Sequence, residues 1–449
     1  MIGRAQLPEG TLHDWVRRAQ GAISERTATL FAEESCRLRI ASHPDGSRDQ
    51  LQHERSRVIA LPRATNERDA DEGRLHSSRA TEIWSQATFD AWWAGQRRSS
   101  DDDTARDALE PELAEPLLET SEAPSREQLS DAVHRIERCL DPLVPVAERF
   151  VELELEEFCR TVRRDRRGCT HWRGRRLAIE VTLVPSGGRG SIARHVGRFE
   201  LTALDELPEI LDEITELGEL ARARRHARPF CGRTDQLIMR PAVASLYLRR
   251  LGRLLSRDAL TRSAATLGVA DLGRRIAAAP VSVCDDPEAG AGVGSRPFDE
   301  QGRSIAPLVA IQDGSLRRFL LHSESARRLG LADGGRGWPS HAGMSEVTTT
   351  NLILSAGTEG AAGLQPPTQL GLELVAHETG SFDERTGTFS DQLWGFARVD
   401  GERVPVSGIR LRGSLLTMFQ AVEAVGSDRR RSRAVSSPSL WIRGFAVGG

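Results

Sequence analysis

The chain has 449 residues, a length that allows two or three domains with a sizeable buried core. Hydrophobic residues make up 39% and charged residues 28%, as expected for a soluble globular protein, and the formal net charge of −3 gives no reason to expect nucleic acid or an anionic membrane as partner. All 61 basic residues are arginines, which excludes lysine-dependent Schiff-base and P-loop chemistry.

Cysteine usage and apolar run length indicate the compartment. The six cysteines are widely spaced and include no CxxC pair, so a disulfide framework is not expected and a reducing cytosol is the natural setting. The N-terminal stretch lacks the hydrophobic region of a signal peptide, and no run approaches the ~18 apolar residues of a membrane span. We therefore expect a cytoplasmic protein.

Residues 1–95 are predicted to form an N-terminal α/β part. Apolar residues recur at helical spacing in 10–24 and again in 80–95, where three tryptophans are expected to be core or interface anchors. Between these helices, residues 27–41 have the pattern of a strand pair and residues 55–61 that of a further strand.

Residues 96–128 differ in composition from the rest. The segment contains the run SSDDD, several glutamates and three prolines, and it is poor in hydrophobic residues. Such a segment cannot build a core, so we interpret it as an acidic linker or partly disordered insert and assign it no function.

Residues 129–228 are predicted to complete the N-terminal domain. A helix over 129–142 presents one apolar face, formed by Leu129, Val133, Ile136 and Leu140. Charged and apolar residues then alternate along 148–184, which indicates half-buried antiparallel strands.

The connections of this domain are predicted to be turns. The very basic stretch 163–176 is expected to be an exposed hairpin turn. The glycine-rich run 186–191 lacks the GK[ST] ending of a phosphate loop and precedes a strand over 198–202, so it is also interpreted as a hairpin turn. A helix over 205–226 ends the domain.

The C-terminal domain is expected to span residues 229–449, beginning with a strand over 236–239 and a helix over 242–260. Its most unusual stretch is 284–302, a loop rich in glycine, proline and acidic residues. We expect Phe298 to anchor one end of this loop by burying its ring. Glycines at 290, 292 and 294 permit positive φ or a close approach to another chain or a ligand.

Four segments after this loop form a recognisable series. They are SESARRLG at 323–330, TNLIL at 350–354, TGTFS at 386–390 and SPSLW at 437–441. In this order and at these separations they resemble the C-terminal half of the TldD/PmbA family, and the PmbA (TldE) branch most closely.

The resemblance implies a fold and an activity. The fold expected is α+β: a mixed N-terminal domain, and a C-terminal domain of curved, mainly antiparallel β-sheet with flanking helices. The family's two-subunit members form a zinc metallopeptidase that cuts short or unfolded peptides, including modified peptide natural products. In its catalytic branch, a His-Glu-x-x-x-His segment and a cysteine near the C-terminus bind the zinc, with the glutamate as base.

The residues of that zinc site are missing from this sequence. The corresponding helix, Ala244–Leu251, contains neither histidine nor glutamate, and the C-terminal stretch 428–439 contains no cysteine. His377 and Glu378 begin a zincin-like motif, but no second histidine follows within a helical turn, and Gly380 is expected in a turn. We expect no metal or cofactor in this chain and zinc in a TldD-like partner.

The resemblance also indicates where peptide would bind. An extended peptide would add main-chain hydrogen bonds to an exposed strand edge. Candidate wall segments are Gly290–Asp299, Ser345–Leu354 and Thr386–Gly395. The substrate-binding candidates within them are Ser295, Arg296, Phe298, Thr350, Asn351, Phe389 and Ser390.

Three functional hypotheses remain open from the sequence. The leading one is a non-catalytic subunit, inactive alone, that pairs with an HExxxH-bearing TldD-like subunit and shapes the peptide chamber. The alternative is a homodimeric binding or regulatory module without peptidase activity. A metal-independent hydrolase is a third, although the sequence has no G-x-S-x-G nucleophile pattern.

Overall fold

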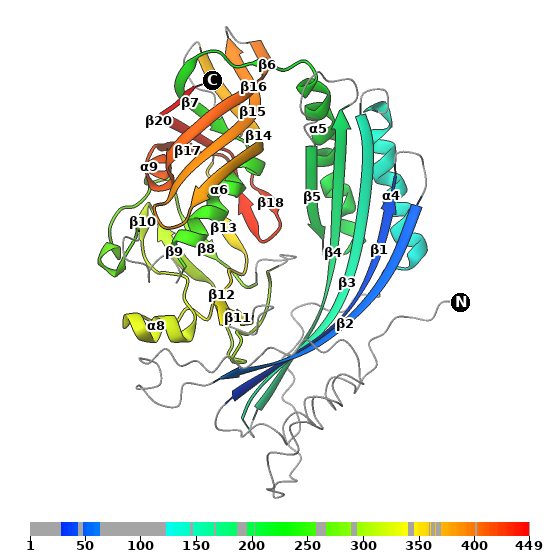
Figure 1. Ribbon diagram of the computed structural model, residues 1–449, viewed down its shortest axis with the longest axis vertical. Helices are drawn as coiled ribbons and strands as arrows, with labels where there is room; N and C mark the ends of the chain where they lie inside the picture. Colours follow the sequence, from blue (N-terminus) through cyan, green and yellow to red (C-terminus); the bar gives the residue numbers. More distant parts are fainter. Residues whose placement is uncertain are drawn as a thin grey trace, which may run out of the picture.

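The computed structural model describes residues 28–43, 48–62, 123–143, 147–165, 168–185, 195–201, 203–256, 266–288, 294–339, 345–358, 360, 364, 370–399 and 402–448. These residues form two lobes that lie side by side (Figure 1). The N-terminal lobe is one long curved sheet with two helices, and the C-terminal lobe contains all the remaining sheets.

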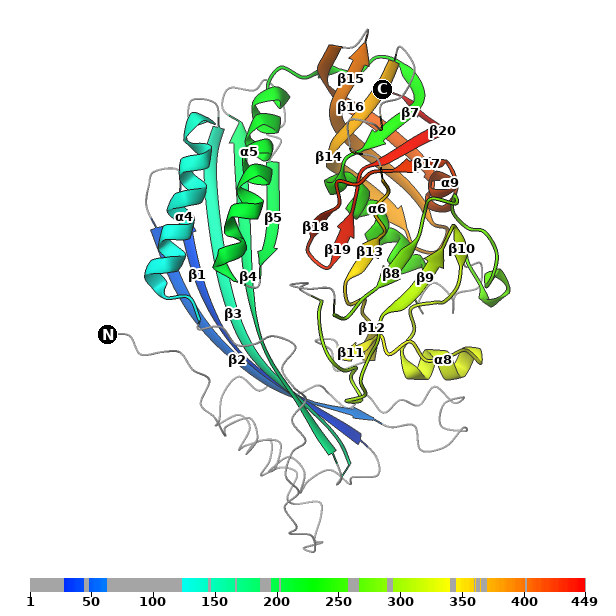
Figure 2. The ribbon, with the colours of Figure 1, turned by 180° about the vertical axis from the view of Figure 1, so that it is seen from behind.

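The N-terminal lobe has a five-stranded antiparallel sheet in the order β2-β1-β3-β4-β5. Its strands are β1 (Ala28–Ser42), β2 (Arg48–Pro62), β3 (Ala147–Asp165), β4 (Gly168–Pro185) and β5 (His195–Leu201). Helices α4 (Arg126–Leu140) and α5 (Leu207–Arg224) cover one face, flanked by the 3-10 turns η2 (Asp141–Leu143) and η3 (Leu204–Glu206) (Figure 2).

Helix α4 has the amphipathic pattern that the sequence predicts. Leu129, Val133, Ile136 and Leu140 are all fully buried against the sheet, as predicted. The helix begins three residues earlier than expected, because Ser125 and Gln128 form a reciprocal capping box.

The C-terminal lobe contains two large sheets. A seven-stranded sheet comprises β6 (Arg228–Pro229), β7 (Arg233–Met239), β14 (Leu370–Asp383), β15 (Thr388–Val399), β16 (Glu402–Ser414), β17 (Val422–Val425) and β20 (Leu440–Gly448). A six-stranded sheet comprises β8 (Val283–Asp285), β9 (Leu308–Gln312), β10 (Ser315–Leu316), β13 (Leu352–Leu354), β18 (Arg430–Ser432) and β19 (Val435–Ser437). Most pairings are antiparallel; β13–β19, β7–β14 and β6–β16 are parallel.

Short elements complete this lobe. Helix α6 (Pro241–Leu254) packs against strands of both large sheets, and α8 (Ser323–Leu329), α9 (Leu415–Gln420), the turn η4 (Val269–Asp271) and the pair β11 (Gly337–Pro339) and β12 (Ser345–Val347) lie around them. Leu237, Tyr247, Leu251 and Leu372 are among the fully buried residues of its large core. The predicted α+β class is therefore confirmed.

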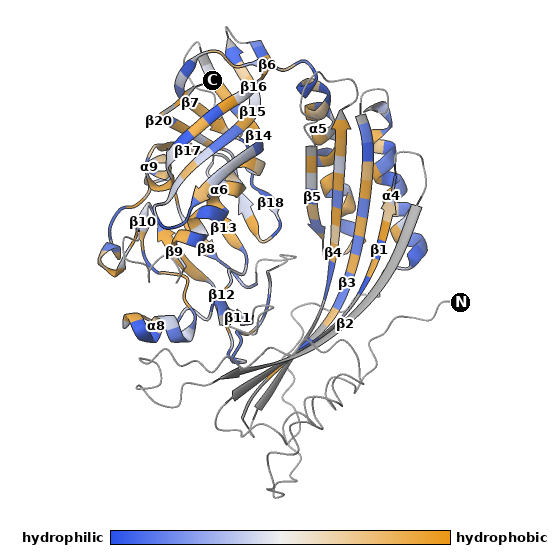
Figure 3. Cartoon of the chain, in the orientation of Figure 1, coloured by the Kyte–Doolittle hydropathy of each residue, from blue (hydrophilic) through white to orange (hydrophobic). Residues whose placement is uncertain are grey.

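Strands β3 and β4 bury opposite faces at their two ends. Hydrophobic and hydrophilic residues alternate along β3 and β4 (Figure 3). Val151, Leu153 and Leu155 of β3 belong to the core that they share with the two helices. Phe158 and Val162 have the other parity, so they point from the opposite face, where they join a separate buried cluster. That cluster also contains Trp172 of β4 and Phe298 and Trp338 of the C-terminal lobe.

This aromatic cluster ties the two lobes together. The Phe158 ring packs edge-on against Trp172 with 4.8 Å between centroids, and Trp172 contacts Phe298 in the same manner at 6.4 Å. The Arg160 guanidinium lies over the rings of Phe158, Trp172 and Trp338. Phe298 is 1% exposed, which confirms that it anchors its loop by burying its ring.

A second contact joins the lobes at the other end of the sheet. Leu220 and Ala223 of α5 pack against Val375, Trp394 and Phe396 on the seven-stranded sheet. Beside them, Arg224 forms an ion pair with Glu378.

Several predicted elements differ in the structure. Residues 27–41 are not a strand pair, because β1 is one continuous strand paired with β2 and β3. The predicted turn at 163–176 belongs almost entirely to β3 and β4, where Arg175 pairs with Glu157 and Arg176 with Glu156 across the strands. Helix α6 ends at Leu254, earlier than predicted.

Other predictions fall outside the part that the structure describes. These are the helices at 10–24 and 80–95, the acidic segment up to residue 122, and the turn at 186–191. None of the helices in the described part of the chain is long and apolar enough to cross a membrane.

The aromatic cluster gives a prediction about stability. Phe298→Ala should lower the free energy of unfolding by about 3–5 kcal/mol, because it leaves a cavity among packed rings. Val309→Ala is the control, because Val309 lies on a strand but is 45% exposed. Urea denaturation followed by tryptophan fluorescence measures both; equal small losses in the two variants would show that the ring of Phe298 contributes no packing between the lobes.

Candidate functional site

Five of the seven candidate residues lie on two segments, 294–298 and 350–351, which are joined to each other and, through Thr350, to one buried carboxylate, Asp285 at the end of β8. Thr350 binds it twice: its backbone N–H donates to Oδ1 at 2.8 Å and its hydroxyl to Oδ2 at 3.0 Å. The Arg336 guanidinium donates to the same carboxylate and, at 2.9 Å, to the Asp285 carbonyl oxygen. Asp285, Arg336 and Thr350 have no exposed surface, so this set fixes the backbone rather than contacting a ligand.

Asn351 fastens the glycine-rich loop to that set. The Gly294 N–H donates to Asn351 Oδ1 at 3.1 Å, and Asn351 Nδ2 donates to Ser295 Oγ at 2.9 Å and to the Asp286 carbonyl at 2.8 Å. A Cβ on Gly294 would lie 1.8 Å from the Thr350 carbonyl oxygen, so the expected close approach is to the chain's own backbone.

Arg296 is a buried cation in the same loop. It is 4% exposed, lies over the Trp338 ring at 4.8 Å and donates from Nη2 to the Thr348 carbonyl at 2.8 Å. Burial lowers its pKa to about 10, so it stays charged at neutral pH. Within the described part of the chain, its Nε and the indole Nε1 of Trp172 are buried donors without an acceptor.

Phe389 and Ser390 lie apart from this group, on β15. The Phe389 ring is 4% exposed and packs against Tyr247 of α6, with 5.1 Å between centroids. Ser390 is half-buried. The seven candidates predicted from the sequence therefore lie in two separate regions: a loop fastened to Asp285, and a sheet surface beside α6.

The neighbour of Ser390, Asp391, is the centre of a polar network that the sequence did not reveal. Its carboxylate accepts hydrogen bonds from the Tyr247 hydroxyl at 2.8 Å and from both terminal nitrogens of Arg250, Nη2 at 2.9 Å. His377 Nε2 lies 3.1 Å from Oδ1. Burial alone would raise the pKa of Asp391, but the hydrogen bonds from His377, Arg250 and Tyr247 outweigh it and lower the pKa to about 2.

His377 and Glu378 do not form a metal motif in the structure. They lie on β14, which continues to Asp383, so Gly380 is in a strand and the predicted turn at this position is wrong. The side chain of His377 faces Asp391, whereas Glu378 pairs with Arg224. Over the described ranges, no group of three or more histidine, cysteine or acidic side chains is arranged to hold a metal ion.

Helix α6 does not suit a zinc ion. Its sequence, PAVASLYLRRLGRL, offers a phenol and guanidinium groups where a zinc peptidase needs imidazole and carboxylate. Arg250 is 8% exposed and forms an ion pair with Asp391. A divalent cation placed there would be repelled by this fixed positive charge. The residues present do not fit the metal.

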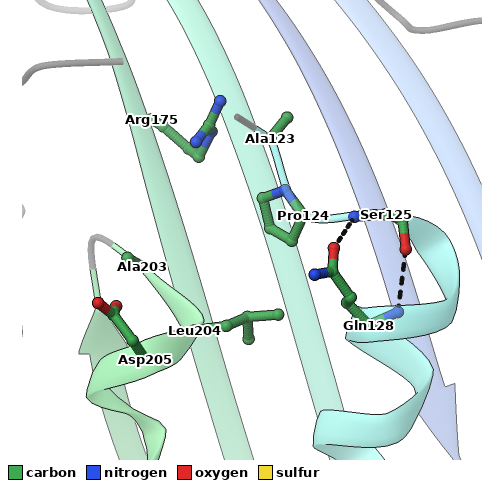
Figure 4. A pocket seen from close by; sticks show the side chains of 8 residues that line it. All are labelled: Ala123, Pro124, Ser125, Gln128, Arg175, Ala203, Leu204 and Asp205. Atoms are coloured by element: carbon green, nitrogen blue, oxygen red, sulfur yellow. Dashed lines mark hydrogen bonds between the residues drawn. The ribbon is translucent and has the colours of Figure 1, made fainter. Parts of the chain in front are cut away.

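A cavity lies elsewhere, in the N-terminal lobe (Figure 4). It has a volume of about 560 Å³ and lies between the N-terminal ends of α4 and η3, lined by Ala123, Pro124, Ser125, Gln128, Arg175, Ala203, Leu204 and Asp205. None of the seven candidates lines it. Arg175 is paired with Glu157, and Ser125 and Gln128 are used in capping.

Sequence comparisons find relatives of this chain among proteins named metalloproteases. Residues 232–449 match the family model of the PmbA/TldA metallopeptidase C-terminal domain. A protein of Methanothermobacter thermautotrophicus named metalloprotease is 26% identical over 335 residues, 71% of this chain and 72% of that protein. Metalloprotease PmbA of Escherichia coli O157:H7 is 29% identical over 181 residues, 40% of this chain and 38% of that protein.

Solved structures show the same fold over nearly the whole chain. TldE from Thermococcus kodakarensis superposes with a TM-score of 0.71 at 14% identity, covering 97% of this chain and 99% of that one. A Thermotoga maritima protein described as a candidate modulator of a DNA gyrase gives 0.74 at 15% identity, with the same coverage. Fold and sequence define a protein of the metallopeptidase-related class. The C-terminal domain, residues 232–449, matches the TldD/PmbA family, and the chain's similarity to PmbA and TldE agrees with the PmbA (TldE) branch.

The Asp391 network gives a prediction with a pH dependence. Asp391→Asn should lower the free energy of unfolding by about 3–5 kcal/mol at neutral pH, because Arg250 stays buried without its anion. The folded pKa is depressed from 3.8 to about 2. The ionised carboxylate therefore stabilises the fold above about pH 4, by about 2 kcal/mol, and this contribution is lost as the pH falls toward about 2.

Urea denaturation of both proteins across this range measures the effect. The difference between wild type and Asp391→Asn should shrink by about 2 kcal/mol on acidification. A difference that stays constant down to the lowest pH would contradict the depressed pKa.

Proposed function

We propose that this chain is the non-catalytic subunit of a TldD/TldE-type heterodimeric zinc metallopeptidase. In this proposal a TldD-like, HExxxH-bearing subunit brings the zinc, and this chain completes and shapes the chamber in which short, unfolded or modified peptides, including natural-product precursors, are cleaved. The proposed setting is the cytoplasm, in keeping with the free Cys139, Cys231 and Cys284.

One observation carries the proposal: the inward-facing polar residues of α6 already bind a carboxylate of the chain itself. Arg250 and Tyr247 bind Asp391 and leave no ligand set on the helix that would hold zinc in the catalytic branch. An arginine that neutralises a buried carboxylate supports the helix without a metal. The fold of the family is kept, but this helix lacks the zinc ligands and the base that would activate a water molecule.

The candidate wall residues take different roles in this proposal. Ser295 and Ser390 are half-buried, and we assign contact with the peptide to them. Arg296, Phe298, Thr350, Asn351 and Phe389 are buried, and we assign to them the role of holding the shape of the wall. Two buried donors without an acceptor, on Trp172 and Arg296, lie in the same cluster, and an acceptor from outside the chain would satisfy them.

The subunit role is tested by co-expression with an HExxxH-bearing TldD-like subunit. Peptide cleavage should appear only with both chains, stop on chelation and return with zinc. A partner whose motif glutamate is replaced by glutamine is the control, because it can assemble but cannot activate water. Cleavage by this chain alone in the presence of a chelator would overturn the proposal. A stable homodimer that ignores the partner would favour the alternative, a binding or regulatory module.

The wall is tested by Asn351→Ala. This change removes two hydrogen bonds that fasten the loop at 294–295 and a third to the Asp286 carbonyl, and it should lower the free energy of unfolding by about 2–3 kcal/mol. In the two-subunit complex we expect a raised KM with zinc content unchanged. Ser295→Ala loses one of these bonds and should give a smaller shift in the same direction. An unchanged KM in both variants would remove the loop from the peptide site.

A further inference from the structure

We propose that three arginines at the seam between the lobes, Arg249, Arg431 and Arg433, form a binding site for the carboxylates of an acidic peptide. The choice of a peptide as ligand rests on the proposed function. Arg249 lies on α6, and Arg431 and Arg433 on the hairpin of β18 and β19. We call these three residues the seam arginines.

The fold brings the seam arginines to the edge of the N-terminal sheet. Strand β18 is in contact with both β5 and α6, and the hairpin lies beside β5 in both views of the molecule (Figures 1 and 2). The backbone of the hairpin is held to α6 by Arg249, whose Nη2 donates to the Ser432 carbonyl at 3.4 Å. Arg431 and Arg433 are exposed, so a ligand can reach them from solvent.

Positive charge exceeds negative charge at this seam. The neighbouring arginines are already paired: Arg176 with Glu156, Arg198 with Glu180, and Arg253 with Glu384. Each seam arginine lacks an ion pair within the described ranges.

One carboxylate, Glu200 of β5, faces the seam arginines. Three cations against one anion leave two positive charges in excess. Each glutamate or aspartate of a peptide would balance one of them.

Glu200 itself is incompletely satisfied. Its Oε2 is buried and has no hydrogen-bond partner within the described chain, and burial raises its pKa despite the surrounding arginines. Burial, together with repulsion from Arg433 and Arg253, lowers the pKa of Arg249. The guanidinium groups therefore repel one another more than Glu200 compensates, and an added carboxylate would relieve that repulsion.

The backbone at the hairpin tip gives an independent indication. Arg433 has a φ of 57°, in the left-handed region that favours glycine. In the described chain one other non-glycine residue has positive φ, Asp313, a type that tolerates it. An arginine at a position where its backbone conformation is strained indicates that its side chain binds a group outside this chain.

Fluorescence anisotropy of the full chain with a labelled glutamate-rich peptide tests the site. The same peptide with glutamine at every glutamate should bind at least tenfold more weakly, and added salt should weaken the glutamate peptide selectively. Arg431→Gln combined with Arg433→Gln should raise the Kd about 5- to 10-fold. Glu200→Gln should lower it, because it adds to the excess positive charge.

The control is Arg317→Gln with Arg318→Gln, two adjacent exposed arginines away from the seam. It removes the same charge and should leave the Kd unchanged. Equal effects of the two double variants, equal binding of the two peptides, or tighter binding of an oligonucleotide of equal charge would each overturn the proposal. Because the assay needs no cleavage, its failure is distinguishable from failure of the two-subunit peptidase assay.

Discussion

The long β3–β4 pair buries one face at one end and the opposite face at the other, and the arrangement of the molecule depends on this. Near the helices, its apolar residues of one parity close the N-terminal core. Farther along, residues of the other parity meet Phe298 and Trp338. Since successive side chains of a strand alternate, one extended pair can serve two cores only if its pattern changes phase, as it does between Leu155 and Phe158.

That phase change also positions the candidate site. The aromatic cluster fixes the position of Phe298, and from there Arg296, Ser295 and Gly294 lead back to Asn351 and Asp285. The loop is therefore held at both ends, by ring packing on one side and by a buried carboxylate on the other. Phe298 also links the loop at 294–304 to the N-terminal lobe. A displacement of one lobe relative to the other would therefore move the wall residues of this loop.

Helix α6 is fixed in the C-terminal lobe by a buried ion pair. A buried carboxylate needs a counter-charge, and here the guanidinium of Arg250 supplies it, with Tyr247 and His377 satisfying the remaining oxygen positions. The guanidinium of Arg250 also makes this part of the helix unsuitable for zinc.

The sequence by itself determined the fold class, the family resemblance, the apolar face of α4, the burial of Phe298 and the absence of a ligand set from α6. These follow from local period, residue type and motif order. It misjudged the basic stretch at 163–176, because whether arginines lie in a turn or in paired strands depends on the glutamates opposite them. Only the tertiary structure decided the Asp285 and Asp391 networks and the seam arginines. The hydrogen bonds Arg336–Asp285, Arg250–Asp391 and Arg249–Ser432 join residues 51, 141 and 183 positions apart, and such pairings depend on how distant strands are brought together and leave no local pattern.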